Sequence, residues 1–164
     1  MTQQTVALPD DPALAQVLSA LSAEGAQALI VGGAVRNALL GEPISDIDIA
    51  TSARPEDTMR LANQAGLRTV PTGVDHGTVT IIAGGRGYEA TSFRRDVETD
   101  GRHAVVAYSD SIEEDARRRD FTMNALYATL DGQVLDPVGG LSDLAQRKLR
   151  FVGDPRARIT EDYL

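Results

Sequence analysis

Hydrophobic and polar positions along this chain follow helical and strand periods in turn. Four apolar side chains between residues 10 and 24 recur at helical spacing: Leu14, Val17, Leu18 and Leu21. Pro12 suits the first turn of this predicted helix. A second amphipathic helix is predicted from Pro55 to Ala65, where Gly66 ends it.

A strand, a glycine turn and a helix are predicted in succession after the first helix. The apolar run Ala28–Val31 has the character of a buried strand. Gly32–Gly33 then forms a tight turn, and a helix runs from Ala34 to Leu40, closed by Gly41.

The second half of the chain predicts a hairpin, a loop and a helix. Thr78–Ile82 and Tyr88–Phe93 alternate as strands do, and the glycine-rich stretch between them predicts a short hairpin loop. Residues 94–108 are polar and without period, which predicts a mobile loop. A helix capped by Ser111 is expected to run through Arg119, with acidic residues early and arginines late.

Two aspartates one residue apart, Asp46 and Asp48, follow the glycine turn. In a strand they share one face, while Ile47 and Ile49 point into a core. Neighbouring carboxylates repel, and Mg²⁺ relieves this by binding one or two carboxylates together with substrate phosphates and water. A lone Asp-x-Asp is also compatible with a solvated strand edge or turn.

The Gly32–Gly33 turn directs backbone N–H groups and a helix N-terminus toward any nearby anion, and Arg36 can add a positive charge. A glycine pair before a helix can also be only a turn, and this one does not match the longer phosphate-loop or dinucleotide patterns. The turn and the acidic pair together favour a site for metal-bound phosphate.

Composition agrees with a single globular domain. The 164 residues are 42% hydrophobic and 24% charged, and the absence of cysteine excludes disulfides, thiolate nucleophiles and thiolate metal sites. No membrane span or signal peptide pattern occurs, so no membrane partner is expected and a cytoplasmic location is predicted. The net charge of -8 is unfavourable for binding RNA with this chain alone.

Three motifs occur in order, Gly32–Arg36, Asp46–Asp48 and Arg118–Leu126, and shorter matches accompany them at Asp100–His103, Asp136–Pro137, Gly139–Leu141 and Asp143–Leu144. With these motifs the chain resembles the head domain of class II tRNA nucleotidyltransferases and bacterial poly(A) polymerases, in the polymerase-β-like nucleotidyltransferase superfamily. The resemblance implies an α/β (α+β) fold with a mixed, mostly antiparallel sheet flanked by helices. Asn37 departs from the family pattern, which usually has Asp after the Arg.

The resemblance also implies roles for individual residues. Asp46 and Asp48 are the expected Mg²⁺ ligands, with Glu89 as an additional catalytic acid on a strand that could pair beside them. Glu89 could instead be an exposed strand residue paired with Arg94 or Arg86. The expected nucleotide-binding residues are Gly32, Gly33, Arg36, Arg119, Asp120, Asn124 and Asp162.

Arg119 is expected to bind phosphates through its forked guanidinium, while Asp120 and Asn124 orient the nucleotide or recognise its ribose hydroxyls. The alternative is a solvated helix C-terminus, where arginines are favoured in any case. In the family, an acid pair and an arginine in the pattern Glu-Asp-x-x-Arg read the incoming base. Glu161 and Asp162 match the acids, but the sequence stops before the arginine, so weak base preference is predicted.

The predicted organisation is an N-terminal helical segment (1–25), the head domain (26–152) and the start of a truncated neck domain (153–164). The predicted activity is template-independent addition of CMP and AMP, from CTP and ATP, to tRNA 3′ ends, with the RNA bound mainly by further C-terminal domains. The alternatives are poly(A) polymerisation on the same head, a nucleotide-binding module without transfer, and a minimal transferase acting on a protein or small molecule. Oligomeric state is left open.

Overall fold

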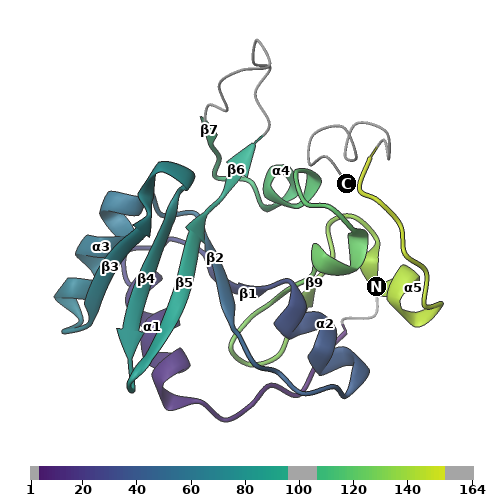
Figure 1. Ribbon diagram of the computed structural model, residues 1–164, viewed down its shortest axis with the longest axis horizontal. Helices are drawn as coiled ribbons and strands as arrows, with labels where there is room; N and C mark the ends of the chain where they lie inside the picture. The colour runs from purple at the N-terminus through teal and green to yellow at the C-terminus, as the bar shows by residue number, and fades with distance from the viewer. Residues whose placement is uncertain (1–3, 96–106, 154–164) are drawn as a thin grey trace.

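Figure 1 shows the computed structural model, which describes residues 4–95 and 107–153 of the chain. Within these residues, one sheet has the strand order β3-β4-β5-β2-β1-β8-β9, and a separate ribbon pairs β6 with β7. The strands are β1 Ala28–Val31, β2 Asp48–Thr51, β3 Arg68–Gly73, β4 Thr78–Ala83, β5 Arg86–Ser92, β6 Arg94–Arg95, β7 Ala107–Tyr108, β8 Tyr127–Ala128 and β9 Val134–Leu135. The helices are α1 Pro12–Leu21, α2 Gly33–Leu40, α3 Pro55–Gln64, α4 Ile112–Arg117 and α5 Gly140–Ala145, with 3₁₀ turns η1 Val74–His76 and η2 Thr122–Asn124.

Strand direction alternates across the sheet at every neighbouring pair but one. Neighbouring strands are antiparallel except for β2 and β5, which run parallel. This arrangement, with helices packed against it, confirms the predicted α/β fold and its mixed, mostly antiparallel sheet.

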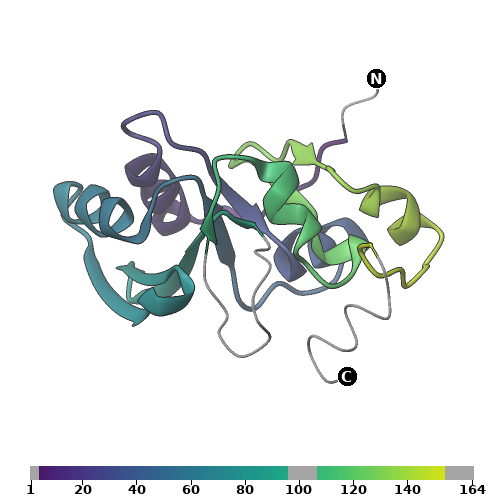
Figure 2. The ribbon, with the colours of Figure 1, turned by 90° about the horizontal axis from the view of Figure 1, so that it is seen from above.

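An apolar cluster lies on each face of the sheet. Ile49 of β2 packs in the cluster that contains residues of α1 and α3, which lie side by side (Figure 2). The next residue, Ala50, packs in the other cluster with Ala116 of α4. Because side chains alternate along a strand, Asp48 points to the same face as Ala50, toward α4.

Local sequence signals explain the predicted elements that the structure contains. Asp11 caps α1 by accepting hydrogen bonds from the N–H groups of Ala13 and Leu14, each at 3.1 Å. Gly41 ends α2 in the left-handed conformation, with φ of +71°. Helix α3 lies within its predicted range, and the predicted β4–β5 hairpin is present, although β5 begins at Arg86, two residues before the predicted Tyr88.

The prediction of a loop over residues 94–108 is wrong at both ends of this range. Arg94 pairs with Tyr108 and Arg95 with Ala107 in the β6–β7 ribbon. This pairing joins residues distant in sequence, so no local period signals it. Residues 96–106, including the Asp100–His103 motif, lie outside the described residues.

The helix predicted to reach Arg119 ends at Arg117, because the chain turns and becomes extended at Phe121. Its predicted start is confirmed, since the Ser111 hydroxyl accepts a hydrogen bond from the N–H of Glu114. Strands β3, β8 and β9 and helix α5 are not predicted from the sequence. Across the described ranges, none of the helices has the length and apolar character needed to cross a membrane.

Candidate active site

Four neighbouring strands, β5, β2, β1 and β8, contribute one row of side chains that crosses the sheet at Asp48, where β2 begins. Asp48 is opposite Glu89 of β5 on one side and Val31 of β1 on the other, and Val31 is opposite Tyr127 of β8. Side chains paired in this way point to the same face of a sheet. The expected pairing of Glu89 beside the acidic segment is confirmed, and Tyr127 joins the same row.

Asp46 lies just before β2, which begins at Asp48. The prediction that both aspartates lie within one strand is therefore wrong for Asp46. The reason is that β1 leaves the sheet at Gly32, where φ is +78°, so the β1–β2 ladder has no pair beyond Val31 and Asp48. Ile47 is nevertheless half-buried against the core, as predicted.

Asp46, Asp48 and Glu89 line one cavity of about 790 Å³. The position of Asp48 takes its carboxylate partly out of water, which raises its pKa, and the charge of Glu89 raises the pKa further. Arg119 lowers this pKa, and the charge of Asp46 adds a smaller increase. The net pKa of Asp48 lies above its ordinary value, and a cation bound nearby would lower it by stabilising the charged carboxylate.

The donor set fits a hard divalent cation in its chemistry, because its atoms are carboxylate oxygens. In residues 4–95 and 107–153, however, no group of three or more His, Cys, Asp and Glu side chains is placed to hold a metal ion. Mg²⁺ commonly binds through one or two carboxylates and completes its coordination with substrate phosphates and water. Metal binding by Asp46 and Asp48 therefore stays a prediction.

The Gly32–Gly33 turn lies beside Asp48 and starts α2. Gly32 adopts the positive φ that favours glycine, and its N–H donates to the carbonyl of Leu126 at 3.0 Å. The Gly32 amide is thus already engaged within the protein. The amides of residues 33–35 belong to the first turn of α2, where helix geometry leaves N–H groups for an anion.

Arg36 is hydrogen-bonded to a residue of the Arg118–Leu126 motif. Its Nη1 donates to Asn124 Oδ1 at 2.8 Å, and Asn124 Nδ2 donates to Asp120 Oδ1 at 3.2 Å. Three residues predicted to bind nucleotide thus form one hydrogen-bonded chain between α2 and η2. Their nucleotide contacts stay predictions.

Asn37 uses both ends of its amide. Its Oδ1 accepts from Arg36 Nε at 3.1 Å, and its Nδ2 donates to the carbonyl of Pro43 at 3.1 Å. An aspartate could accept from Arg36 but could not donate to Pro43. Asn37 therefore ties the loop that carries Asp46 to α2.

Arg119 is largely buried, and its partners Asp115 and Tyr127 are not predicted from the sequence. Nη2 of Arg119 lies 3.0 Å from Asp115 Oδ2, and Nε donates to the Tyr127 hydroxyl at 3.2 Å. Burial lowers the pKa of Arg119, but Asp115 and Tyr127 together, through their charges and hydrogen bonds, outweigh burial, and the net pKa lies above the ordinary value. The i,i+4 spacing of Asp115 and Arg119 is a sequence signal that could have found this pair.

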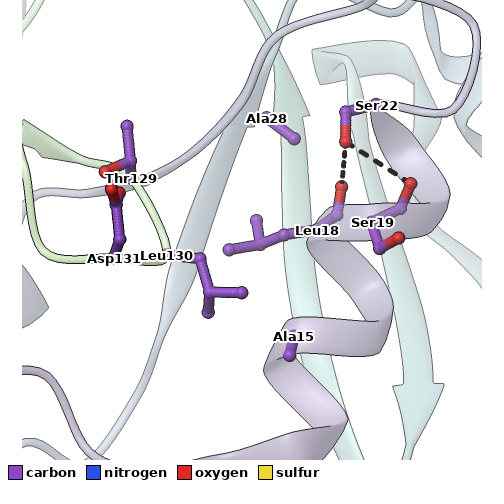
Figure 3. Close-up of a pocket in the computed structure, with 8 residues that line it drawn as sticks. All are labelled: Ala15, Leu18, Ser19, Ser22, Ala28, Thr129, Leu130 and Asp131. Carbon is purple, nitrogen blue, oxygen red and sulfur yellow. Dashed lines mark hydrogen bonds between the residues drawn. The ribbon is translucent and has the colours of Figure 1, made fainter.

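A second hollow lies apart from this site, between α1 and the turn that joins β8 to β9. Its lining is mostly apolar, and the hydrogen bonds drawn there run from the Ser22 hydroxyl to carbonyls of its own helix (Figure 3). None of the predicted site residues lines it. Its lining residues are Ala15, Leu18, Ser19, Ser22, Ala28, Thr129, Leu130 and Asp131. Asp162, predicted to contact the base, lies outside the described residues.

A family profile described as "Poly A polymerase head domain" matches residues 28–150. The chain belongs to this family. The match contains the acidic pair, the glycine turn and the Arg119–Asn124 segment. The head-domain fold and the site geometry thus coincide in one stretch of sequence.

Known relatives of this head domain are longer proteins. A CCA-adding enzyme of Streptococcus gordonii is 48% identical over 150 residues, which cover 90% of this chain and 37% of the relative. The solved structure of the Bacillus stearothermophilus CCA-adding enzyme in complex with CTP has a TM-score of 0.80 and 41% identity, covering 93% of this chain and 37% of that one. A tRNA nucleotidyltransferase complexed with a primer tRNA and an incoming ATP analogue has a TM-score of 0.66 and 29% identity, covering 88% and 40%. The structural likeness confirms the predicted nucleotidyltransferase head fold.

Proposed function

We propose that this head domain is the catalytic part of a template-independent RNA nucleotidyltransferase that adds CMP and AMP, from CTP and ATP, to tRNA 3′ ends. The observation that carries the proposal is the pairing of Asp48 with Glu89 beside the Gly32–Gly33 turn. This arrangement brings the acids and the N-terminal amides of α2 together where β1 ends and β2 begins. The names of the relatives, and the CTP, ATP analogue and tRNA in their solved complexes, support this choice of reaction.

In this reaction the RNA 3′-hydroxyl attacks the α-phosphorus of CTP or ATP in line, and pyrophosphate leaves. Asp46 and Asp48 would hold Mg²⁺, which lowers the pKa of the attacking hydroxyl and neutralises the triphosphate. Glu89, beside Asp48, supplies the third carboxylate.

The remaining predicted residues bind the nucleotide. The amides of residues 33–35 and the guanidinium of Arg36 bind phosphate oxygens, and Gly32 shapes the turn that presents them. Asn124 and Asp120 hold Arg36 in place and orient the nucleotide. Arg119 contributes a second forked donor to the phosphates.

The RNA is held mainly outside this domain, because a net charge of -8 repels a polyanion. The domain boundaries that we propose are 1–25, 26–152 and 153–164, with Asp162 of the last segment contacting the base. The enzyme acts in the cytoplasm, where tRNA is matured. The resident metal is Mg²⁺, because carboxylate oxygens and phosphates are the ligands that it prefers.

A chimera tests the proposed activity. This chain replaces the head of the Bacillus stearothermophilus enzyme, and the chimera receives tRNA transcripts that lack their 3′ ends, with CTP, ATP or both. We expect addition of a CCA end with both nucleotides, and its loss in Asp46→Ala and in Asp48→Ala. Long tails from ATP alone would indicate poly(A) polymerisation instead, and full activity of Asp48→Ala would contradict the proposed site.

A further inference from the structure

Asp115 is a buried carboxylate surrounded by hydrogen-bond donors. Its exposed fraction is 0%. Oδ1 accepts from the backbone N–H of Arg94 and from Arg118 Nε, each at 3.1 Å. Oδ2 accepts from the Tyr127 hydroxyl at 2.6 Å and from Arg119 Nη2 at 3.0 Å. Because a buried charge is costly unless it is fully compensated, this carboxylate fixes the positions of its partners.

Tyr127 connects this carboxylate to the active-site row. Its side chain is fully buried, and it lies two strands from Asp48, about 9.5 Å at the usual strand spacing. Its hydroxyl donates to Asp115 and accepts from Arg119 Nε. The guanidinium carbon of Arg119 lies 5.6 Å from the centre of the Tyr127 ring.

Arg119 is therefore restrained along one edge of its guanidinium. Nε and Nη2 share that edge, and both are bonded. Nη1, on the remaining edge, donates no hydrogen bond within the described part of the chain. Because Arg119 is bonded to the Tyr127 hydroxyl, and Tyr127 belongs to the row of side chains that contains Asp48, Arg119 lies on the same face of the sheet as Asp48.

We propose that Asp115 and Tyr127 are positioning residues, which hold Arg119 so that its second edge meets the triphosphate beside Asp48. This inference rests on the proposed function, because that function supplies the triphosphate. Neither residue touches the nucleotide. They act by fixing Arg119 before the ligand binds, so that less side-chain freedom is lost on binding.

Tyr127→Phe tests the inference because it removes one hydroxyl and changes no charge. Calorimetry measures the dissociation constants of CTP and of inorganic tripolyphosphate, both with Mg²⁺, for this chain. We expect both ligands to bind roughly fivefold more weakly to Tyr127→Phe. In an Arg119→Ala background the same substitution should change the dissociation constants by less than about twofold, since residues that act through one another are not additive.

Ser22→Ala is the control, because it also removes one hydroxyl and changes no charge. The Ser22 hydroxyl donates to the carbonyl of Leu18 at 2.7 Å, and Ser22 lines the second hollow, apart from the candidate active site. Ser22→Ala should therefore leave both dissociation constants unchanged. Asp115→Glu is the second variant, in case Tyr127→Phe does not fold. It keeps the charge but displaces the carboxylate, and its effect should also disappear in the Arg119→Ala background.

Two results would overturn the inference. One is undiminished binding of both ligands by folded Tyr127→Phe and Asp115→Glu. The other is an equal loss with and without Arg119, which would indicate a purely structural role. Failure of the unsubstituted chain to bind either ligand would instead overturn the proposed function on which the inference rests.

Discussion

The charge of Asp115 links the stability of the fold to pH. Burial raises its pKa, but Arg119 and Arg118, with the hydroxyl of Tyr127 and the N–H of Arg94, outweigh burial, and the net pKa lies below the ordinary value of 3.8. In the unfolded chain these partners are lost, so the carboxyl binds protons more readily there. The stabilising contribution is therefore complete above about pH 4 and is lost as pH falls through the folded-state pKa.

Asp115→Asn should remove this contribution. We expect the free energy of unfolding at neutral pH to fall by about 3–5 kcal/mol, since breaking a buried ion pair leaves its partners uncompensated. The difference from the unsubstituted chain should shrink as pH falls below about 4. Urea unfolding across this range measures both effects. Glu24→Gln, which removes an exposed ion pair with Arg60, should change little. A difference that stays constant with pH would contradict the assigned charge.

Site residues were predictable from sequence where a motif or a strand period carried them. The pairing of Glu89 with Asp48 follows from two strands that alternation already indicates. The contact between Arg36 and Asn124 joins residues 88 positions apart, and only the folded chain shows that one holds the other. Asp115 was missed because a buried acid within a charged helix has the same sequence signature as an exposed one.

The contact between α5 and η2 depends on the absence of a side chain at Gly140. A Cβ atom there would lie 2.1 Å from the carbonyl oxygen of Thr122. Asp136 accepts hydrogen bonds from the N–H groups of Gly140 at 2.6 Å and Leu141 at 3.0 Å, which fixes the start of α5. This close approach supports η2, the turn that contains Asn124.

Gly140→Ala should therefore disturb both stability and the site. We expect the free energy of unfolding to fall by about 2–3 kcal/mol, since the clash is with backbone that must move. CTP binding should weaken as well, because η2 supports Arg36 through Asn124. Gly85→Ala is the control: its Cβ meets no atom within 4 Å, so it should cost only about 1–2 kcal/mol for its positive φ. Chemical unfolding and calorimetry measure these effects, and equal losses for both variants would contradict this role of Gly140.

Elements with several residues of clear period were predictable, whereas short paired segments were not. The amphipathic pattern of α1 and α3 and the alternation of β4 and β5 extend over enough residues to be recognised. Strands β8 and β9 have two residues each, too few to show a period. Strand β3 contains Pro71 where the register shifts, which places it among the irregular edge strands that sequence patterns describe poorly.

Over the whole molecule, the net negative charge has different consequences for binding RNA and for binding a nucleotide. The charge of -8 disfavours RNA, but in the proposed function a triphosphate would arrive with a cation and would meet local donors in Arg36, Arg119 and the α2 amides. Glu161 and Asp162, the residues predicted to read the base, lie outside the described residues. Phosphate binding should therefore dominate the affinity, with weak preference among the four bases.

A thermal-shift titration of this chain with CTP, ATP, GTP and UTP, with and without Mg²⁺, tests the central claim most directly. At about 100 times the dissociation constant, each nucleotide should add roughly 2.7 kcal/mol of stability and raise Tm by about 5–10 °C, in the presence of Mg²⁺ only. The shift should be similar for the four nucleotides and absent in Asp46→Ala/Asp48→Ala. A shift that is independent of Mg²⁺, or that persists in the double variant, would contradict the assignment of a metal-bound triphosphate to Asp46 and Asp48.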